Sequence, residues 1–194
     1  MNSKSGHRGR SRTRSAGSFW KWVALAAPVV FLVGLVAVSI VSEPRDDELG
    51  PAPDFELATI EGQEVSLDET LAQGDTLLYF SMGVGCDGCF AQIPELEAAA
   101  ADRGLNLVPI MVDAGPLVAS EAARFGITTP ILLDPGAEIS SAYGMVGIYG
   151  HGDRPSHSFA LVREGGDIAW IRHYAEMFVP AETLFAELDQ AVGA

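Results

Sequence analysis

Cysteine is scarce in this chain, since its 194 residues include only Cys86 and Cys89. A disulfide between two residues so close in sequence would close a very short loop, and such a loop removes little entropy from the unfolded chain. The pair is therefore a poor structural cross-link. Its spacing instead indicates a chemical role, which could be electron exchange, metal binding or peroxide reduction.

Basic side chains are also few beyond residue 42, where six arginines and no lysine stand against all 26 acidic residues of the chain. Such an acidic part lacks the basic face that nucleic acid requires, so we expect no nucleic-acid partner. It should also be repelled by anionic lipid headgroups. A phosphate-binding loop is excluded as well, because no Gly-Lys-Ser/Thr follows Gly83 and Gly85.

Charge is absent from residues 22–41, WVALAAPVVFLVGLVAVSIV. Twenty helical residues at about 1.5 Å each would span the roughly 30 Å of hydrocarbon in a bilayer. Residues 1–21 carry six basic and no acidic side chains, which places the N-terminus in the cytoplasm. We therefore predict a basic cytoplasmic tail at 1–21, a transmembrane helix at 22–41, a linker at 42–53 and an extracytoplasmic domain at 54–194 of a single-pass protein of the cytoplasmic membrane.

A cleaved signal peptide is the alternative to an anchor. Ala37-Val38-Ser39 is an acceptable small-x-small cleavage site. The apolar run is longer than the roughly 7–15 residues of a signal peptide, which favours the anchor. No cysteine lies near residue 40 to carry a lipid.

The rest of the chain alternates strand and helix signals, which predicts a sheet of mixed direction covered by helices. A continuous apolar run over 76–80 has the length of a buried central strand. We expect further strands at 55–57, 64–67, 105–112, 131–133, 158–162 and 168–172, and helices at 68–73, 89–101 (kinked by Pro94), 117–125, 137–143 and 181–192.

Cys86-Asp87-Gly88-Cys89 stands where the central helix begins. Backbone N–H groups and the helix dipole at that place favour a thiolate, which is the nucleophile in disulfide exchange. In this interpretation Cys86 attacks, and Cys89, about one turn further on, resolves the mixed disulfide. Asp87 opposes this, because a neighbouring carboxylate raises the pKa of a thiol.

The order strand, CDGC, helix, strand, helix, hairpin, helix resembles the thioredoxin superfamily. APDFELATIEGQEVSL, TTPILLDPGAEISSAYGM and SFALVREGGDIAWI are similar to segments of its membrane-anchored TlpA/ResA-like and AhpC/TSA-like redoxin branch, over residues 51–192. The resemblance implies a thioredoxin-like α/β fold and a thiol–disulfide oxidoreductase without a cofactor. Its implied partners are thiols or disulfides of exported proteins and a membrane redox protein.

Three positions depart from that family. Gly85 replaces the aromatic residue that usually precedes the first cysteine, and Gly83 replaces the Thr or Ser of peroxiredoxins. A thiol peroxidase is therefore an alternative rather than the leading function. The position that holds a cis-proline in the family is Ser156 here. Our candidate for the cis-proline is therefore Pro155, one residue earlier, and Pro130 is a weaker candidate.

His151 and His157 are expected in a loop near that proline, as solvated or turn-capping residues. A second alternative is a soft-metal site, because Sco-like copper proteins combine two cysteines with a distant histidine on the same fold. Their cysteines are one residue further apart than Cys86 and Cys89. We predict no metal ligand here, and we expect His173 to be half-buried on a hairpin strand.

Overall fold

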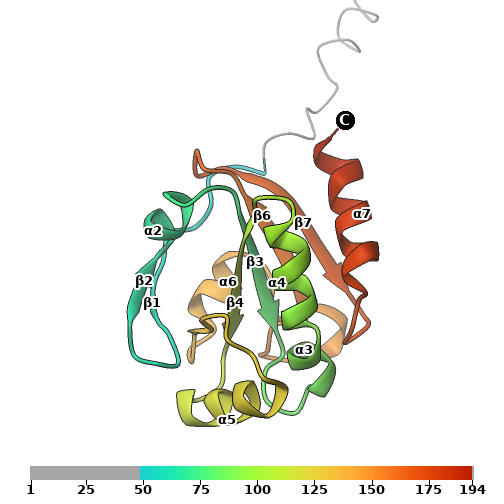
Figure 1. Cartoon of the computed structure of the whole chain (residues 1–194). Helices are drawn as coiled ribbons and strands as arrows, with labels where there is room; N and C mark the ends of the chain where they lie inside the picture. Colours follow the sequence, from blue (N-terminus) through green and yellow to red (C-terminus); the bar gives the residue numbers. More distant parts are fainter. Residues whose placement is uncertain (1–48, 194) are drawn as a thin grey trace, which may run out of the picture. The chain divides into compact units, whose positions relative to one another are not determined.

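The computed structural model describes residues 49–193, which fold around one five-stranded sheet (Figure 1). The predicted cytoplasmic tail, transmembrane helix and most of the linker lie outside the described residues. Within residues 49–193, no helix combines the length and the apolar character needed to cross a membrane.

The sheet is of mixed direction, as predicted, with strand order β5-β4-β3-β6-β7. The central strand β3 pairs in parallel with β4 and antiparallel with β6. A separate hairpin, β1 with β2, precedes it. The strands are β1 (Glu56–Ala58), β2 (Glu64–Ser66), β3 (Thr76–Ser81), β4 (Asn106–Met111), β5 (Leu132–Leu133), β6 (His157–Val162) and β7 (Ile168–Tyr174).

The helices follow the predicted order, with two local differences. The helix after the cysteines is broken at Gln92, two residues before Pro94, and a short 3-10 turn, η1, precedes β6. The helical segments are α2 (Leu67–Leu71), α3 (Asp87–Ala91), α4 (Ile93–Ala101), α5 (Gly115–Phe125), α6 (Glu138–Ala142), η1 (Ile148–Gly150) and α7 (Ala181–Val192).

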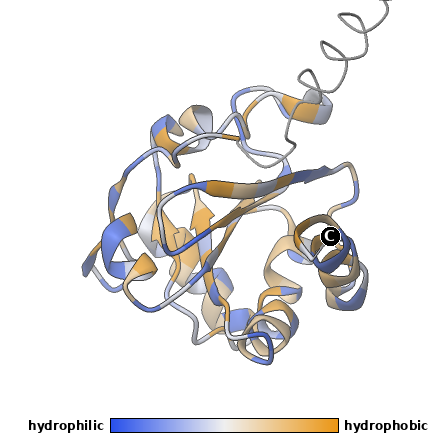
Figure 2. Cartoon of the chain, turned by 90° about the horizontal axis from the view of Figure 1, so that it is seen from above, coloured by the Kyte–Doolittle hydropathy of each residue, from blue (hydrophilic) through white to orange (hydrophobic). Residues whose placement is uncertain are grey.

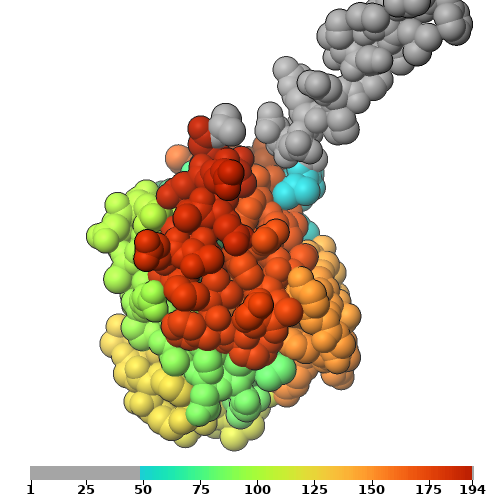
Figure 3. All heavy atoms as spheres, turned by 90° about the vertical axis from the view of Figure 1, so that its right-hand side faces the viewer, coloured from blue at the N-terminus to red at the C-terminus, as the bar shows by residue number. Residues whose placement is uncertain are grey.

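Strand β3 is buried on both faces, which explains its continuous apolar sequence. Leu77 and Tyr79 belong to one core cluster, and Leu78 and Phe80 belong to the other. Helices α4 and α7 pack together over the first cluster, and Figure 3 shows α7 spread across that side. The hydrophobic strands lie between the covering segments in Figure 2.

Three loops meet at one edge of the sheet. The parallel strands β3 and β4 both end there, with Ser81 opposite Met111. Strand β6 runs antiparallel to β3, so it begins at the same edge with His157. This topology brings the loop before Cys86, the loop after β4 and the loop before β6 together.

Candidate functional site

Cys86 and Cys89 form a disulfide at this edge. Cys86 is the N-cap of α3, and its sulfur accepts a hydrogen bond from the backbone N–H of Cys89 at 3.2 Å. Cys86 keeps 5% of its surface exposed, whereas Cys89 is fully buried. A hydrogen bond to sulfur favours the thiolate of Cys86 once the pair is reduced. Cys86 is also the more exposed residue of the two, so a partner is expected to meet it first.

An ion pair holds the loop before Cys86. Arg154 and Asp113 make two parallel hydrogen bonds, Nη1 to Oδ2 at 3.0 Å and Nη2 to Oδ1 at 2.7 Å. Asp113 also accepts from the backbone N–H of Val84 at 2.7 Å, and Arg154 donates to the carbonyl of Met82 at 2.6 Å. Burial would raise the pKa of Asp113, but the hydrogen bonds from Arg154 and Val84 lower it below its usual value.

Gly83 is required by this ion pair. Its φ of +80° lies in the left-handed region, and a Cβ added there would overlap Oδ2 of Asp113. The peroxiredoxin Thr or Ser therefore has no room at this position. Gly85 also has a positive φ, of +98°, but nothing lies within 4 Å of a Cβ added there.

Asp87, between the cysteines, is paired with Arg124 of α5. The hydrogen bond from Arg124 lowers the pKa of the Asp87 carboxyl, so this residue carries its charge over a wide pH range. Arg124 also bonds Glu121 and lies 4.2 Å over the ring of Phe125. The guanidinium partly offsets the repulsion between Asp87 and a Cys86 thiolate that the sequence predicts.

Gly88 lies against the segment between β7 and α7. A Cβ at this glycine would come within 2.7 Å of the carbonyl oxygen of Met177. A hydrogen bond also ties the segment to the end of α3, since the backbone N–H of Val179 donates to the Gln92 side chain at 3.0 Å. The Cβ of Phe178, a side chain that is 43% exposed, lies 3.4 Å from a Cβ added at Gly88.

The sequence predicts His157 in a loop, and this prediction is wrong. His157 is the first residue of β6 and is fully buried, with Nδ1 3.2 Å from the Tyr79 hydroxyl and 3.9 Å from the Cys89 sulfur. Burial lowers its pKa to about 4. The prediction failed because β6 begins one residue earlier than its apolar pattern suggests.

The other two histidines of residues 49–193 have contacts other than the sulfurs. His151 is partly buried directly after η1. His173 is half-buried on β7, as predicted, and its Nδ1 lies 2.8 Å from the Ser158 hydroxyl. In the part of the chain that the structure describes, no three His, Cys, Asp or Glu side chains are grouped as metal ligands would be.

The prediction of a cis-proline at Pro155 is wrong, because every peptide bond among residues 49–193 is trans. Pro155 is buried and forms an antiparallel bridge with Val146. The next residue, Ser156, donates its N–H to the carbonyl of Met145 at 3.1 Å. This pairing joins the segment before β6 to the chain around Val146.

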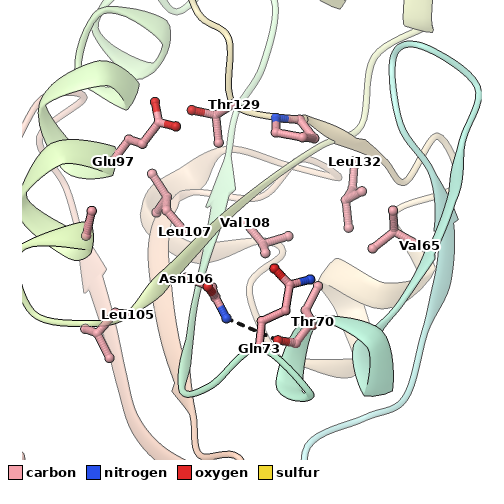
Figure 4. Close-up of a pocket in the computed structure, with 12 residues that line it drawn as sticks. Val65, Thr70, Gln73, Glu97, Leu105, Asn106, Leu107, Val108, Thr129 and Leu132 are labelled. Atoms are coloured by element: carbon pink, nitrogen blue, oxygen red, sulfur yellow. Dashed lines mark hydrogen bonds between the residues drawn. The ribbon is translucent and has the colours of Figure 1, made fainter.

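A separate cavity of about 390 Å³ lies along β4, away from the cysteines (Figure 4). None of its lining residues comes from the three loops around Cys86. Those residues are Val65, Thr70, Gln73, Glu97, Ala101, Leu105, Asn106, Leu107, Val108, Thr129, Pro130 and Leu132. The cavity therefore takes no part in the chemistry of the sulfurs.

Sequence reasoning missed four side chains of the site: Tyr79, Asp113, Arg124 and Arg154. One signal was available for Asp113, which comes directly after the strand predicted at 105–112 and two residues after the observed end of β4. The pairing of Asp113 with Arg154, 41 residues away, carries no local pattern. Tyr79 reads as an ordinary core residue of the central strand.

Comparison with known proteins identifies the family of this chain. The family model described as Redoxin matches residues 48–177. The chain belongs to the redoxin family. Its fold is thioredoxin-like, since the structure of peroxidoxin BcpB from Mycobacterium tuberculosis superposes with a TM-score of 0.59 over 76% of this chain and 94% of that one, at 20% identity.

Curated relatives match part of this redoxin. The thiol-disulfide oxidoreductase ResA of Geobacillus thermodenitrificans is 33% identical over 48% of this chain and 55% of its own length. Rv2521 of Mycobacterium tuberculosis, whose name provisionally makes it a peroxiredoxin, is 31% identical over 50% of this chain and 62% of its own. The chain thus spans less than two thirds of the length of each.

Proposed function

We propose that this redoxin is a thiol–disulfide oxidoreductase in which Cys86 attacks and Cys89 resolves. The observation that carries the proposal is the Cys86–Cys89 disulfide, in which the first cysteine keeps a small exposed surface and the second is fully buried. A bridge over so short a loop contributes little stability. The similarity to ResA supports the same chemistry.

The exchange conserves electrons and atoms in two steps. The Cys86 thiolate attacks a client disulfide, forming a mixed disulfide and releasing one client thiol. Cys89 then attacks the Cys86 sulfur and releases the second client thiol, which leaves the pair oxidised and the client reduced by two electrons. Another dithiol must return two electrons to the pair, and we assign this role to a membrane redox partner.

The location is part of the proposal. Residues 22–41 would anchor the chain in the cytoplasmic membrane, with the redoxin domain outside acting on exported proteins. A membrane-impermeant maleimide applied to intact reduced cells should label Cys86 of the full chain. Protection of Cys86 until the cells are lysed would place the domain inside and contradict the topology.

Two cysteine variants of the full chain test the activity. Cys86→Ser should abolish reduction of insulin or of Ellman's reagent, because the attacking sulfur is gone. Cys89→Ser should keep the first step and accumulate a mixed disulfide, visible as an adduct in the intact mass. Exchange at the wild-type rate in both variants would exclude the proposed function.

A thiol peroxidase is the second candidate, favoured by the name of Rv2521 and by the fold of BcpB. In that reaction Cys86 would take one oxygen from a peroxide, and Cys89 would expel it as water and form the disulfide. The Asp113 carboxylate occupies the space that a side chain at position 83 would need. The Thr or Ser of a peroxiredoxin peroxide site therefore does not fit there, which argues against this candidate. In stopped flow, thiol oxidation no faster than that of free cysteine would remove this candidate.

A soft-metal site, the remaining alternative, is tested by titrating the reduced chain with Cu(I). Tight binding that disappears in both cysteine variants would support it. Binding no tighter than that of either variant would remove it.

A further inference from the structure

The buried sulfur of Cys89 needs a proton acceptor. A thiol attacks as its thiolate, and apolar surroundings hold the proton on sulfur. Cys89 is fully buried, so bulk water has no direct access to its sulfur. The resolving step therefore depends on a group inside the protein.

His157 occupies the required place. Its Nδ1 lies 3.9 Å from the Cys89 sulfur, within reach of an S–H donor. The hydroxyl of Tyr79 lies 3.2 Å from the Cys89 carbonyl and 3.2 Å from Nδ1. When its one proton is donated to the carbonyl, the imidazole carries its own proton on Nε2, which has no hydrogen-bond partner among the described residues, and Nδ1 keeps its lone pair for the sulfur. Burial lowers the pKa of His157 to about 4, so the imidazole is neutral at pH 7 and is a weaker base than a free histidine.

The other groups around the imidazole do not compete for this role. Tyr79 of β3 and Tyr174 of β7 face the ring, and Phe159 packs against it. Burial raises the pKa of Tyr79 well above its usual value and that of Tyr174 to about 12, so both stay protonated. The Glu187 carboxylate accepts a hydrogen bond from the Tyr174 hydroxyl, so its contact is with the tyrosine.

We propose that His157 accepts the proton of the Cys89 thiol when the mixed disulfide on Cys86 is resolved, an inference that rests on the proposed function. The S–H proton moves to Nδ1, and the Cys89 sulfur bonds to the Cys86 sulfur. The bond between Cys86 and the client breaks, and the client leaves as a thiolate. His157 gives up its proton, the client thiolate takes one up, and the imidazole is neutral again.

Ellman's reagent separates the two steps in the reduced full-length chain. A first release of thionitrobenzoate reports attack by Cys86, and a second reports attack by Cys89. His157→Gln should slow the second phase about 100-fold at pH 7, the range of general-base assistance, and leave the first unchanged. His151→Gln, six residues away, should leave both phases unchanged.

The wild-type pH profile tests the inference without any variant. An internal base with a pKa of about 4 makes the second phase nearly constant from pH 5 to 8. A rise of about tenfold per pH unit over that range would show direct loss of the proton to solvent and overturn the inference. Equal second phases in wild type and His157→Gln would do the same.

The two proposals fail in different ways. A wild-type first phase no faster than that of free cysteine would end the proposed function, and this inference with it. A fast first phase with a second phase insensitive to His157 would end only the inference.

Discussion

The two cysteines of one disulfide share the main core cluster but differ in their neighbours. Two ion pairs lie near Cys86, the Asp113–Arg154 pair behind the preceding loop and the Asp87–Arg124 pair beside it. Cys89 is fully buried, and the imidazole of His157 lies 3.9 Å from its sulfur. The difference suits a division of labour, in which one sulfur meets partners and the other reacts only with its neighbour.

The comparison also shows how each environment is held. The Cys86 side depends on ion pairs between loops that are distant in sequence, so single substitutions can disturb it. The Cys89 side is part of the main core, with Tyr79, Phe159 and Tyr174 around His157. Changes there should alter protonation and stability together.

The largest effect is expected from a substitution at Gly83, in the loop before Cys86. Gly83→Ala should lower the free energy of unfolding by about 2–5 kcal/mol, since it adds backbone strain to a steric overlap with Asp113. Gly85→Ala is the matched control, because it has a similar φ but open space around the added Cβ. Urea unfolding measures both. An equal loss in the two variants would mean that Asp113 does not restrict the loop.

A change of pH should probe the Cys89 side through His157. Its pKa is about 4 in the folded chain and about 6.5 when unfolded, so the unfolded state binds the proton more tightly. This contribution to stability is complete above about pH 6.5 and falls by roughly 3 kcal/mol as the pH drops to about 4.

The control for this effect is His157→Gln in the oxidised form. Carboxylates titrate in both proteins over this range, so the difference between the two urea-unfolding profiles isolates the histidine. The gap should shrink as the pH falls from about 6.5 to about 4. A gap that stays constant over that range would show that His157 is not buried in its neutral form.

The ion pair behind the Cys86 loop should have a smaller effect. Asp113→Asn should cost about 1–3 kcal/mol, because Arg154 loses a charged partner that is itself largely buried. The pKa of Asp113 is lowered on folding, so its contribution is present above its unfolded pKa of about 3.9 and is lost as the pH falls further. Asp102→Asn, at an exposed helix end, is the control and should change stability little. Equal losses in the two variants would exclude a role for the pair.

The smallest effect is expected at Arg124. Arg124→Ala removes the positive charge beside Asp87, so the Cys86 thiolate should form less readily and the first Ellman phase should slow by at most about fivefold. Added salt should reduce the difference, because the pair is exposed. A larger effect that persists in high salt would mean that Arg124 acts through packing on Phe125.

Most of the fold could be predicted from the sequence because its signals are local. The apolar run at 76–80 marks the central strand, and the cysteine spacing marks the start of α3. The errors lie at boundaries and in conformations that tertiary contacts decide. The bridge between Pro155 and Val146 is an example, since it pairs two segments and no local sequence pattern predicts it.

The site could be predicted only in part. Its reactive residues, Cys86 and Cys89, stand out by composition alone. The side chains that tune them come from β3, α5, β6 and the loop after β4, and their meeting depends on the sheet topology. His157 illustrates the limit. The sequence predicts the start of β6 at residue 158, which leaves His157 in a loop, whereas β6 begins at residue 157 and the histidine is buried near the Cys89 sulfur.

The central claim, that Cys86 and Cys89 exchange electrons with partners, is tested most directly by the equilibrium potential of the pair. The full-length chain is equilibrated in glutathione buffers, quenched by alkylation and weighed by mass spectrometry. We predict a midpoint between about −270 and −120 mV, the range of thioredoxin-fold catalysts from reductases to oxidants. A midpoint below about −300 mV, as in structural disulfides, would contradict the account.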